Sequence, residues 1–247
     1  MEFDPPLQSG RLIRRYKRFL ADVVLDDGRR VTAHCPNTGS MLGCRAPGLR
    51  VWLSPADRPG RKLRWTWELV ETGTGALAGI HTGRSNALVV EAIKSGRIPE
   101  LADYQQLRRE VRHPSGGRTD IVLEKPGRRC WVEVKNVTAG AGAGRALFPD
   151  AVSTRAVRHL AHLRASAAAG ERAVLLFCVQ REDVAVVEPA RAIDPAYADA
   201  LAAAADAGVE VLAYGASLSP RGIRLDRRLT ARTRDQVHAI HNHPAMV

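Results

Sequence analysis

Two carboxylates and one lysine in neighbouring strand-like segments are the residues of this chain best suited to chemistry. Asp120 lies in the run 119–124, and Glu133 and Lys135 lie in the run 131–136. Both runs are rich in Ile, Val, Leu or Trp and flank a short basic turn, so they predict an antiparallel hairpin. The hairpin would bring Asp120 close to Glu133. Glu133 and Lys135 would point to the same face because they are two residues apart on a strand.

These side chains are the ones that metal-assisted hydrolysis of a phosphodiester needs. Carboxylate oxygens hold Mg²⁺ or Mn²⁺, and a lysine orients or deprotonates the attacking water. We therefore predict Asp120 and Glu133 as metal ligands, with the backbone carbonyl of Val134 as a further ligand. Lys135 completes the predicted catalytic set. The alternative is a chance pattern, because acids and lysines at this spacing occur in many soluble proteins.

The scarcity of lysine favours a functional role for this pattern. Of the 37 basic residues only five are lysines, namely Lys17, Lys62, Lys94, Lys125 and Lys135. Arg stays protonated at working pH, whereas a partly buried Lys can give up its proton. A simple ion pair between apolar strand residues would cost desolvation and gain little stability. A metal or a substrate explains these charges better.

Helix and strand patterns alternate after residue 85. The run 86–95 predicts a helix that ends at a glycine, and Glu91 lies off its apolar stripe. Residues 99–109 predict a second helix. The Ala/Gly run 139–144 lacks the lysine and the glycine spacing of a phosphate-binding loop, so it predicts a flexible loop.

The rest of this region predicts an α/β layer. A helix from about residue 150 to 169 carries Arg155 and His159. The apolar runs 173–179 and 209–214 are typical of strands covered on both faces, and an alanine-rich helix separates them. The order of elements places helices on both sides of a sheet.

The first 70 residues read as about five short strands separated by turns. This spacing favours a small barrel of the oligonucleotide-binding (OB) type. Tyr16 is suited to stack on a base, and core packing is the alternative for its ring. The same segment holds cations suited to phosphate contacts, namely Arg14, Arg15, Lys17 and Arg18.

Length and composition are those of a folded soluble protein with one large or two modest domains. The chain has 247 residues, of which 45% are hydrophobic and 26% charged. No secretory signal and no apolar run of about 18 residues is evident, so we expect no membrane association. The four cysteines have no CxxC spacing, which favours reduced thiols in a cytoplasm.

The net charge of +11 predicts a polyanionic partner. Residues 1–70 hold 13 of the 37 basic residues and 7 of the 26 acidic ones. The first part of the chain is therefore expected to carry the denser basic surface.

Several segments together resemble the sugar fermentation stimulation protein family, SfsA, over nearly the whole chain. The segments are 15–21 (RYKRFLA), 34–39 (HCPNTG), 118–121 (RTDI), 132–137 (VEVKNV), 148–152 (FPDAV) and 208–214 (GVEVLAY). The resemblance implies an OB-fold-like nucleic-acid-binding domain at 1–80 and a PD-(D/E)XK nuclease-like α/β domain with a mixed central sheet at 81–235. The residues 236–247 would be a flexible tail.

The resemblance also implies a function and a site. It implies non-specific DNA binding and a regulatory role in sugar (maltose) metabolism. The catalytic set of the nuclease superfamily maps onto Asp120, Glu133 and Lys135, and an acid on the first helix maps best onto Glu91. The alternative for Glu91 is a solvated helix face.

Two functions are therefore compatible with the sequence. The first is a cytoplasmic DNA-binding protein with a Mg²⁺-dependent nuclease site, in which Arg155 or His159 contacts the phosphate. The alternative is a non-catalytic DNA-binding regulator that keeps the nuclease fold. RNA as a partner and a homodimer are both compatible with the sequence, whereas an enzyme that acts directly on a sugar has little support because no other acid pair suggests glycoside chemistry.

Overall fold

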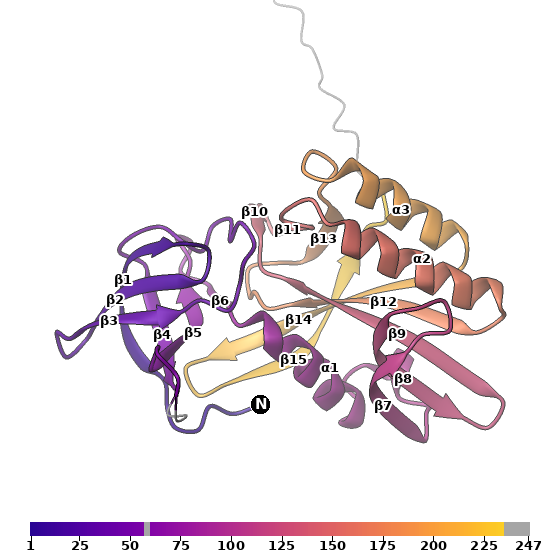
Figure 1. The fold of residues 1–247 in the computed structure, drawn as a ribbon, viewed down its shortest axis with the longest axis horizontal. Coiled ribbons are helices and arrows are strands. Elements are labelled where there is room, and N and C mark those ends of the chain that lie inside the picture. Colours follow the sequence, from indigo (N-terminus) through magenta and orange to yellow (C-terminus); the bar gives the residue numbers. More distant parts are fainter. Residues whose placement is uncertain (57–59, 235–247) are drawn as a thin grey trace, which may run out of the picture.

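The computed structural model describes residues 1–56 and 60–234, so the tail expected at 236–247 lies outside the described residues. In Figure 1 a small barrel built from the first part of the chain lies beside a larger domain with a central sheet. These two parts confirm the expected combination of an all-β barrel and an α/β domain with a mixed central sheet.

Six strands form the barrel sheet, in the order β3-β2-β1-β4-β5-β6. A parallel pairing of His34 in β3 with Thr66 in β5 closes it. The strands are short because turn residues interrupt them, and their inward side chains surround the fully buried Trp67. The strand bounds are Gln8–Tyr16 (β1), Leu20–Leu25 (β2), Arg30–His34 (β3), Arg50–Pro55 (β4), Trp65–Glu71 (β5) and Leu77–Gly79 (β6).

Nine strands form the second sheet, in the order β10-β11-β13-β15-β14-β12-β9-β8-β7. Strand β9 pairs antiparallel with β8 and parallel with β12, so the sheet is mixed. The strand bounds are Gln106–Arg112 (β7), Arg118–Lys125 (β8), Arg128–Val137 (β9), Gly140–Gly142 (β10), Arg145–Phe148 (β11), Arg172–Val179 (β12), Val186–Pro189 (β13), Glu210–Ser219 (β14) and Gly222–Ala231 (β15).

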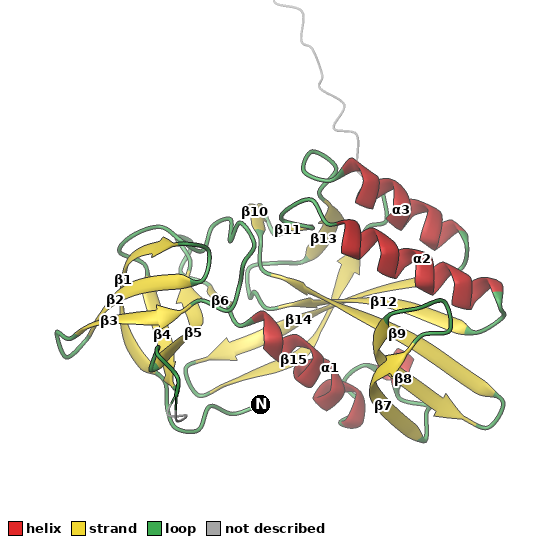
Figure 2. Cartoon of the chain, in the orientation of Figure 1, coloured by secondary structure: helices red, strands yellow, loops and turns green. Residues whose placement is uncertain are grey.

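Helices pack on both faces of this sheet (Figure 2). One face carries α1 (Ser85–Lys94), and the other carries α2 (Thr154–Ala168) and α3 (Pro195–Asp206). Two short 3-10 turns, η1 (Thr82–Arg84) and η2 (Pro99–Leu101), flank α1. All three helices lie where the sequence predicted a helix.

Successive side chains of β9 point to opposite faces of the sheet, and this decides which helix each of them contacts. Val132 and Val134 are buried in the cluster that includes α1, whereas Trp131 is buried in the cluster that includes α2 and α3. Glu133 and Lys135 have the same parity as Trp131, so both point to the α2 side of the sheet.

The segment 99–109 is not the helix that its residues predicted. After the single turn η2 the chain enters strand β7, which pairs with β8 at the edge of the sheet, with Leu107 opposite Leu123. Helix propensity is a weak preference, and pairing with a neighbouring strand outweighs it here.

The prediction of a flexible loop at 139–144 was also wrong. Residues 140–142 form strand β10, which pairs with β11. Gly140 lies directly against a buried side chain, because a Cβ at this position would come within 2.5 Å of Cζ of Arg181. Near the end of the described chain, β14 extends beyond the predicted run 209–214. Strand β15, which pairs with β14, was not predicted.

The barrel and the larger domain contact each other directly. The backbone nitrogen of Gly79 donates to the carbonyl of Gln180 at 2.8 Å. The buried Arg181 donates to the carbonyl of Thr138 at 3.1 Å and to the sulfur of Cys44 at 3.3 Å. These bonds join β6 and a loop of the barrel to the segments that follow β9 and β12.

All four cysteines are buried and free, as expected for reduced thiols. In the part of the chain that the structure describes, no helix has the length and apolar character needed to cross a membrane.

Candidate active site

The hairpin of β8 and β9 brings the two predicted acids together. Ile121 pairs with Val132, so Asp120 and Glu133 are the next residues along the two strands, where the pairing ends. Instead of a backbone partner, Val134 donates its N–H to Oδ2 of Asp120 at 2.8 Å. The Asp120 carboxylate therefore takes the place of a strand neighbour at the end of β8.

Glu133, Lys135 and His159 form a buried cluster on the α2 side of β9. Oε1 of Glu133 accepts a hydrogen bond of 2.7 Å from Lys135 Nζ and another from His159 Nδ1. The side chains of Glu133, Lys135 and His159 expose only 5%, 11% and 12% of their surface. The structure thus brings Asp120, Glu133, Lys135 and His159 to one place.

Arg155 contacts the second ring nitrogen of His159. Its Nε lies 3.3 Å from Nε2 of the imidazole, one helical turn along α2. Nδ1 faces both the Glu133 carboxylate and, at 3.1 Å, Lys135 Nζ. Arg155 itself is exposed, so the guanidinium is free to meet a ligand as well.

The two carboxylates differ in their electrostatic environment. Burial and the negative charge of Glu133 raise the pKa of Asp120 above its ordinary value, against the hydrogen bonds from Val134 and Asn86. Burial also acts to raise the pKa of Glu133, but the hydrogen bond from His159 and the charge of Lys135 outweigh it and leave this pKa lowered. An ionised glutamate therefore lies beside an aspartate whose charge is unfavourable, and a cation between them would relieve the repulsion.

The oxygen atoms of the cluster that can still accept a ligand fit a hard divalent cation. Among the described residues none donates a hydrogen bond to Oε2 of Glu133, and each oxygen of Asp120 accepts one. The N–H and C=O of a strand residue leave on the same side, so the carbonyl of Val134 also faces Asp120. Mg²⁺ and Mn²⁺ prefer oxygen donors of this kind.

The protein supplies only part of a coordination shell. Residues 1–56 and 60–234 contain no group of three or more His, Cys, Asp or Glu that could hold a metal. Mg²⁺ is often bound by one or two carboxylates, with water and substrate phosphate as the other ligands. Two acids and a carbonyl are therefore sufficient for Mg²⁺ but poorly suited to a structural zinc ion.

The structure does not bring Glu91 into this cluster. Its carboxylate binds the N-terminal amino group of Met1 at 2.8 Å and Arg97 at 3.0 Å. The residue of α1 that reaches the acids is Asn86, whose Nδ2 donates to Oδ1 of Asp120 at 2.9 Å. Glu91 lies five positions after Asn86 in the helix, so the two side chains lie on different faces and more than one turn apart.

A polar network that the sequence analysis missed holds the start of α1 against β9. Asn136 Oδ1 accepts hydrogen bonds from Ser85 Oγ at 2.9 Å and from Gln180 Nε2 at 2.6 Å, and Asn136 Nδ2 donates to Thr138 at 2.8 Å. The only sequence signal was the pair Ser85 and Asn86 at the first turn of the helix, which is common at helix ends for other reasons.

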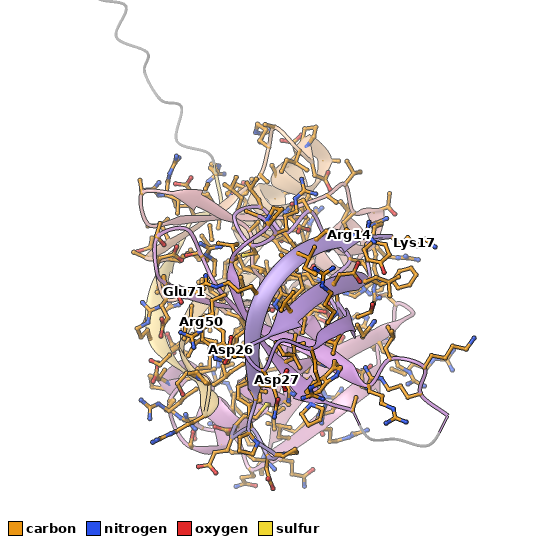
Figure 3. The ribbon with its side chains drawn as sticks, turned by 90° about the vertical axis from the view of Figure 1, so that its left-hand side faces the viewer. Arg14, Lys17, Asp26, Asp27, Arg50 and Glu71 are labelled. Atoms are coloured by element: carbon orange, nitrogen blue, oxygen red, sulfur yellow. The ribbon has the colours of Figure 1, made fainter. Side chains whose placement is uncertain are left out.

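The predicted nucleic-acid contacts of the barrel are mostly engaged within the barrel. Arg14 pairs with Asp22 at 2.8 Å and lies 4.7 Å from the centre of the Tyr16 ring. Tyr16 in turn donates to Asp22 at 3.2 Å. In Figure 3, Arg14 and Lys17 lie near each other at one edge of the barrel, while Asp26, Asp27 and Glu71 lie elsewhere on it. Lys17 is exposed.

Arg15 and Arg18 bind backbone carbonyls. Arg15 Nη2 donates to the carbonyls of Asn37 and Gly39, both at 3.0 Å, and Arg18 donates to that of Thr38 at 2.8 Å. This loop lines a cavity of about 270 Å³ together with the end of β9 and the segment before α2. The two arginines therefore shape a loop at the boundary between the barrel and the larger domain.

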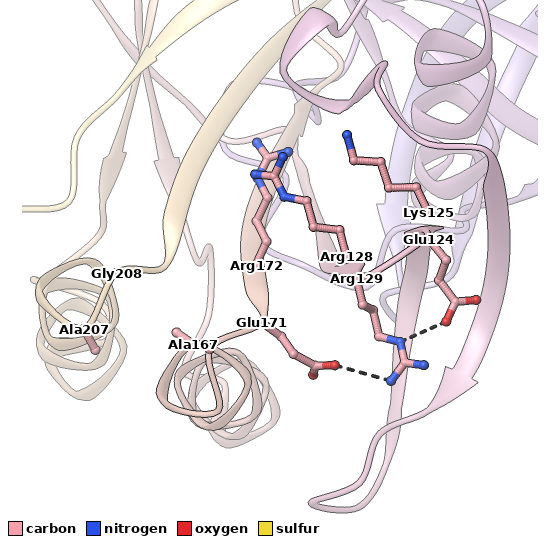
Figure 4. A pocket seen from close by; sticks show the side chains of 11 residues that line it. Glu124, Lys125, Arg128, Arg129, Ala167, Glu171, Arg172, Ala207 and Gly208 are labelled. Carbon is pink, nitrogen blue, oxygen red and sulfur yellow. Dashed lines mark hydrogen bonds and ion pairs between the residues drawn. The ribbon is translucent and has the colours of Figure 1, made fainter.

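A second cavity, of about 610 Å³, lies at the other end of β9 (Figure 4). It is bordered by the tip of the β8–β9 hairpin and by the last turns of α2 and α3. Arg129 pairs there with Glu124 at 2.9 Å and with Glu171 at 3.3 Å, and Arg172 pairs with Glu210 at 2.7 Å. Because its charges are largely paired with each other, this cavity is a weaker candidate than the acid cluster.

Two family models match the chain. The one described as the sugar fermentation stimulation protein RE domain matches residues 83–222, and the one described as the SfsA N-terminal OB domain matches residues 13–80. The first alone covers more than half of the chain. The chain belongs to the SfsA family.

Relatives of known name are similar over most of the SfsA chain. The sugar fermentation stimulation protein homolog of Alkalilimnicola ehrlichii is 57% identical over 233 residues, which are 93% of this chain and 98% of that protein. The homolog of Thioalkalivibrio sulfidiphilus is 58% identical over 230 residues, 93% of this chain and 97% of that protein. The sequence resemblance to SfsA is thus confirmed.

A solved structure agrees with the fold. SfsA of Pyrococcus furiosus, determined in complex with Ca²⁺, superposes with a TM-score of 0.82 at 29% identity and covers 94% of this chain and 98% of that one. The barrel followed by a mixed sheet is therefore the fold of the SfsA family.

Proposed function

We propose that this SfsA protein is a Mg²⁺- or Mn²⁺-dependent phosphodiesterase that acts on DNA with little sequence preference. One observation carries the proposal: Asp120 and Glu133 meet at the end of a hairpin, with Lys135 and His159 bound to one oxygen of Glu133. A carboxylate pair beside phosphate would weaken DNA binding without a metal, so a binding protein alone has no need of it.

The chemistry of the donors supports a hard cation at this position. Asp120, Glu133 and the carbonyl of Val134 would hold it, and when bound it would activate water and stabilise negative charge on the phosphate. The complex of the Pyrococcus furiosus relative with Ca²⁺ supports the same assignment, because Ca²⁺ takes oxygen ligands as well.

The other side chains of the cluster have distinct roles in this proposal. Lys135 positions the attacking water. Its Nζ is held 2.7 Å from Oε1 of Glu133. His159 donates from Nδ1 to Glu133, which orients that carboxylate. The exposed guanidinium of Arg155, one turn away on α2, is placed to contact a phosphate oxygen.

A non-catalytic DNA-binding regulator is the second candidate. Its support is that both Lys135 and His159 are bound to Glu133, so their bonds also satisfy a purely structural carboxylate. A regulatory role in sugar metabolism, which the family name suggests, would be compatible with either candidate.

One experiment separates the two candidates. The purified protein is incubated with single- and double-stranded DNA and with RNA, in Mg²⁺, Mn²⁺ or EDTA, in parallel with Glu133→Ala. Metal-dependent cleavage that the variant loses is the expected result. Salt-sensitive binding without cleavage under every condition would leave only the binding protein.

A further inference from the structure

A row of imidazoles leads from the acid cluster along α2 to the turn between β7 and β8. The ring of His159, which contacts Glu133, stacks on His162 with centroids 6.2 Å apart. His162 stacks in turn on His113 at 5.1 Å, with the ring planes 8° apart. His113 Nε2 lies 2.9 Å from Ser166 Oγ. The β7–β8 turn is therefore fixed against α2.

Exposed arginines lie on both elements that the row joins, the β7–β8 hairpin and α2. Arg112 and Arg118 face each other across the base of the β7–β8 turn. On α2, Arg155 and Arg158 each lie one turn before a histidine of the row. Among the described residues no carboxylate forms an ion pair with any of these four arginines. We call the following residues the basic band: Arg112, His113, Arg118, Arg155, Arg158, His159 and His162.

His113 supports the band rather than contacting a ligand, because its side chain is buried and its Nε2 is bonded to Ser166. His113 Nδ1 accepts a hydrogen bond of 3.1 Å from the backbone nitrogen of Ser115, which leaves the ring proton on Nε2. Burial lowers the pKa of both His113 and His162. His162 forms no hydrogen bond with the described residues and is half-buried. Its ring nitrogens are thus free to bind a ligand.

We propose that the basic band binds the sugar–phosphate backbone of the DNA strand that runs away from the acid cluster. The band is continuous with that cluster, because His159 belongs to both. From Arg155 to Ser166, α2 spans about 16 Å, a length that matches about four to five phosphates at 3.4 Å per nucleotide of one strand. Guanidinium groups suit phosphates because their forked N–H donors reach two oxygens at once.

This location of the DNA deepens the proposed function. The direction in which the DNA strand runs away from the acid cluster rests on that function. It places the main DNA contacts on the α/β domain and not on the barrel, where the sequence predicted them. Strand β7 supports this, because it carries Arg109 and Arg112 against a single acid of its own, Glu110, while its third arginine, Arg108, is paired with Glu124.

The test compares two sets of three substitutions that remove the same charge. The band variant is Arg112→Gln/Arg118→Gln/Arg158→Gln, and the barrel variant is Arg30→Gln/Arg45→Gln/Arg64→Gln. All six arginines are exposed. Affinity for a fluorescent 20-base-pair duplex is measured in EDTA over a range of salt, so that neither metal nor cleavage enters. Thermal unfolding checks that both variants are folded.

We expect the band variant to lower the slope of log affinity against log salt by between 2 and 3, at about 0.9 for each lost phosphate contact. The barrel variant should change the slope by less than 1. The variant Arg112→Lys/Arg118→Lys/Arg158→Lys should restore most of the slope because it keeps the charge.

Other results would overturn the proposal. An equal or larger loss in the barrel variant would place the DNA on the barrel, and a wild-type protein that binds no duplex in EDTA would refute the band outright. Failure of the proposed function looks different: binding would depend on the band while no cleavage occurred with any metal.

Discussion

The barrel and the α/β domain are both rich in arginine, but they use it differently. In the barrel, Arg14 pairs with Asp22 at 2.8 Å and Arg29 pairs with Asp27 at 2.7 Å, while Arg15 binds loop carbonyls. In the α/β domain the arginines of the basic band have no acid partner among the described residues, and they border the acid cluster. A count of charges along a chain therefore does not locate the surface that binds a polyanion.

The pairing of individual residues across strands accounts for part of the difference. In the barrel, Arg14 lies directly opposite Asp22 in β1 and β2, although Arg11 also lies opposite Arg50 in β1 and β4. The β7–β8 turn instead places Arg112 opposite Arg118. Two like charges across a pair of strands are unfavourable unless an anion lies nearby, which is consistent with a bound phosphate.

The largest expected effect is the difference in cleavage rate between variants of two acids of the α/β domain, Glu133 and Glu91. Glu133→Gln should reduce metal-dependent cleavage of DNA by about 10³-fold or more, because metal stabilisation of the transition state is worth several kcal/mol. Glu91→Gln is the matched control and should change the rate by less than about threefold, since Glu91 is paired with Met1 and Arg97. Initial rates on a labelled duplex in Mg²⁺ provide the measurement. Equal losses in both variants would contradict the assignment of the cluster.

Metal binding should stabilise the protein through the α/β domain only. At a Ca²⁺ concentration about 100-fold above the dissociation constant, stabilisation of about 2.7 kcal/mol is expected, which raises the melting temperature of a protein of this size by roughly 5 to 10 °C. Asp120→Asn should remove the shift. Asp22→Asn, in the barrel, should keep it. Calorimetry with and without EDTA checks both, and a shift retained in Asp120→Asn would argue against this ligand.

The far end of the basic band should make stability depend on pH. Burial lowers the pKa of His113 below its ordinary value of 6.5. The unfolded chain therefore binds more protons between that value and the folded pKa, so this stabilisation is complete above pH 6.5 and is lost as pH falls through the folded pKa. Urea denaturation between pH 8 and pH 5 should show a shallower decline for His113→Gln than for the wild type. Parallel curves would mean that other groups dominate.

The smallest effect is expected in the barrel. Arg14→Gln should change duplex affinity by less than about twofold, because the guanidinium is engaged by Asp22 at an exposed site and contributes little. Fluorescence anisotropy at fixed salt tests this beside Arg158→Gln, for which a clear loss is expected. A larger loss for Arg14→Gln would reverse the comparison between the two regions.

Local patterns in the sequence determined much of this structure. The apolar runs on either side of a basic turn predicted the β8–β9 hairpin, and an apolar stripe predicted α1. Capping residues and terminal glycines predicted α2 and α3. The approach of Glu133 to Lys135 followed from the two-residue period of a strand alone. These features depend on residues close together in the chain, which is why the sequence was sufficient.

Only the tertiary structure decided which groups meet across long separations. Residues 106–112 became a strand because β8 offered an edge, and 140–142 did so because β11 and Arg181 lie against it. Asn86 rather than Glu91 contacts Asp120 because the start of α1, and not its middle, approaches β9. The same long-range packing left the arginines of the basic band without an acid partner among the described residues and engaged Arg14, Arg15 and Arg18 of the barrel. Side-chain type sets what a residue can bind, and the fold sets what lies within its reach.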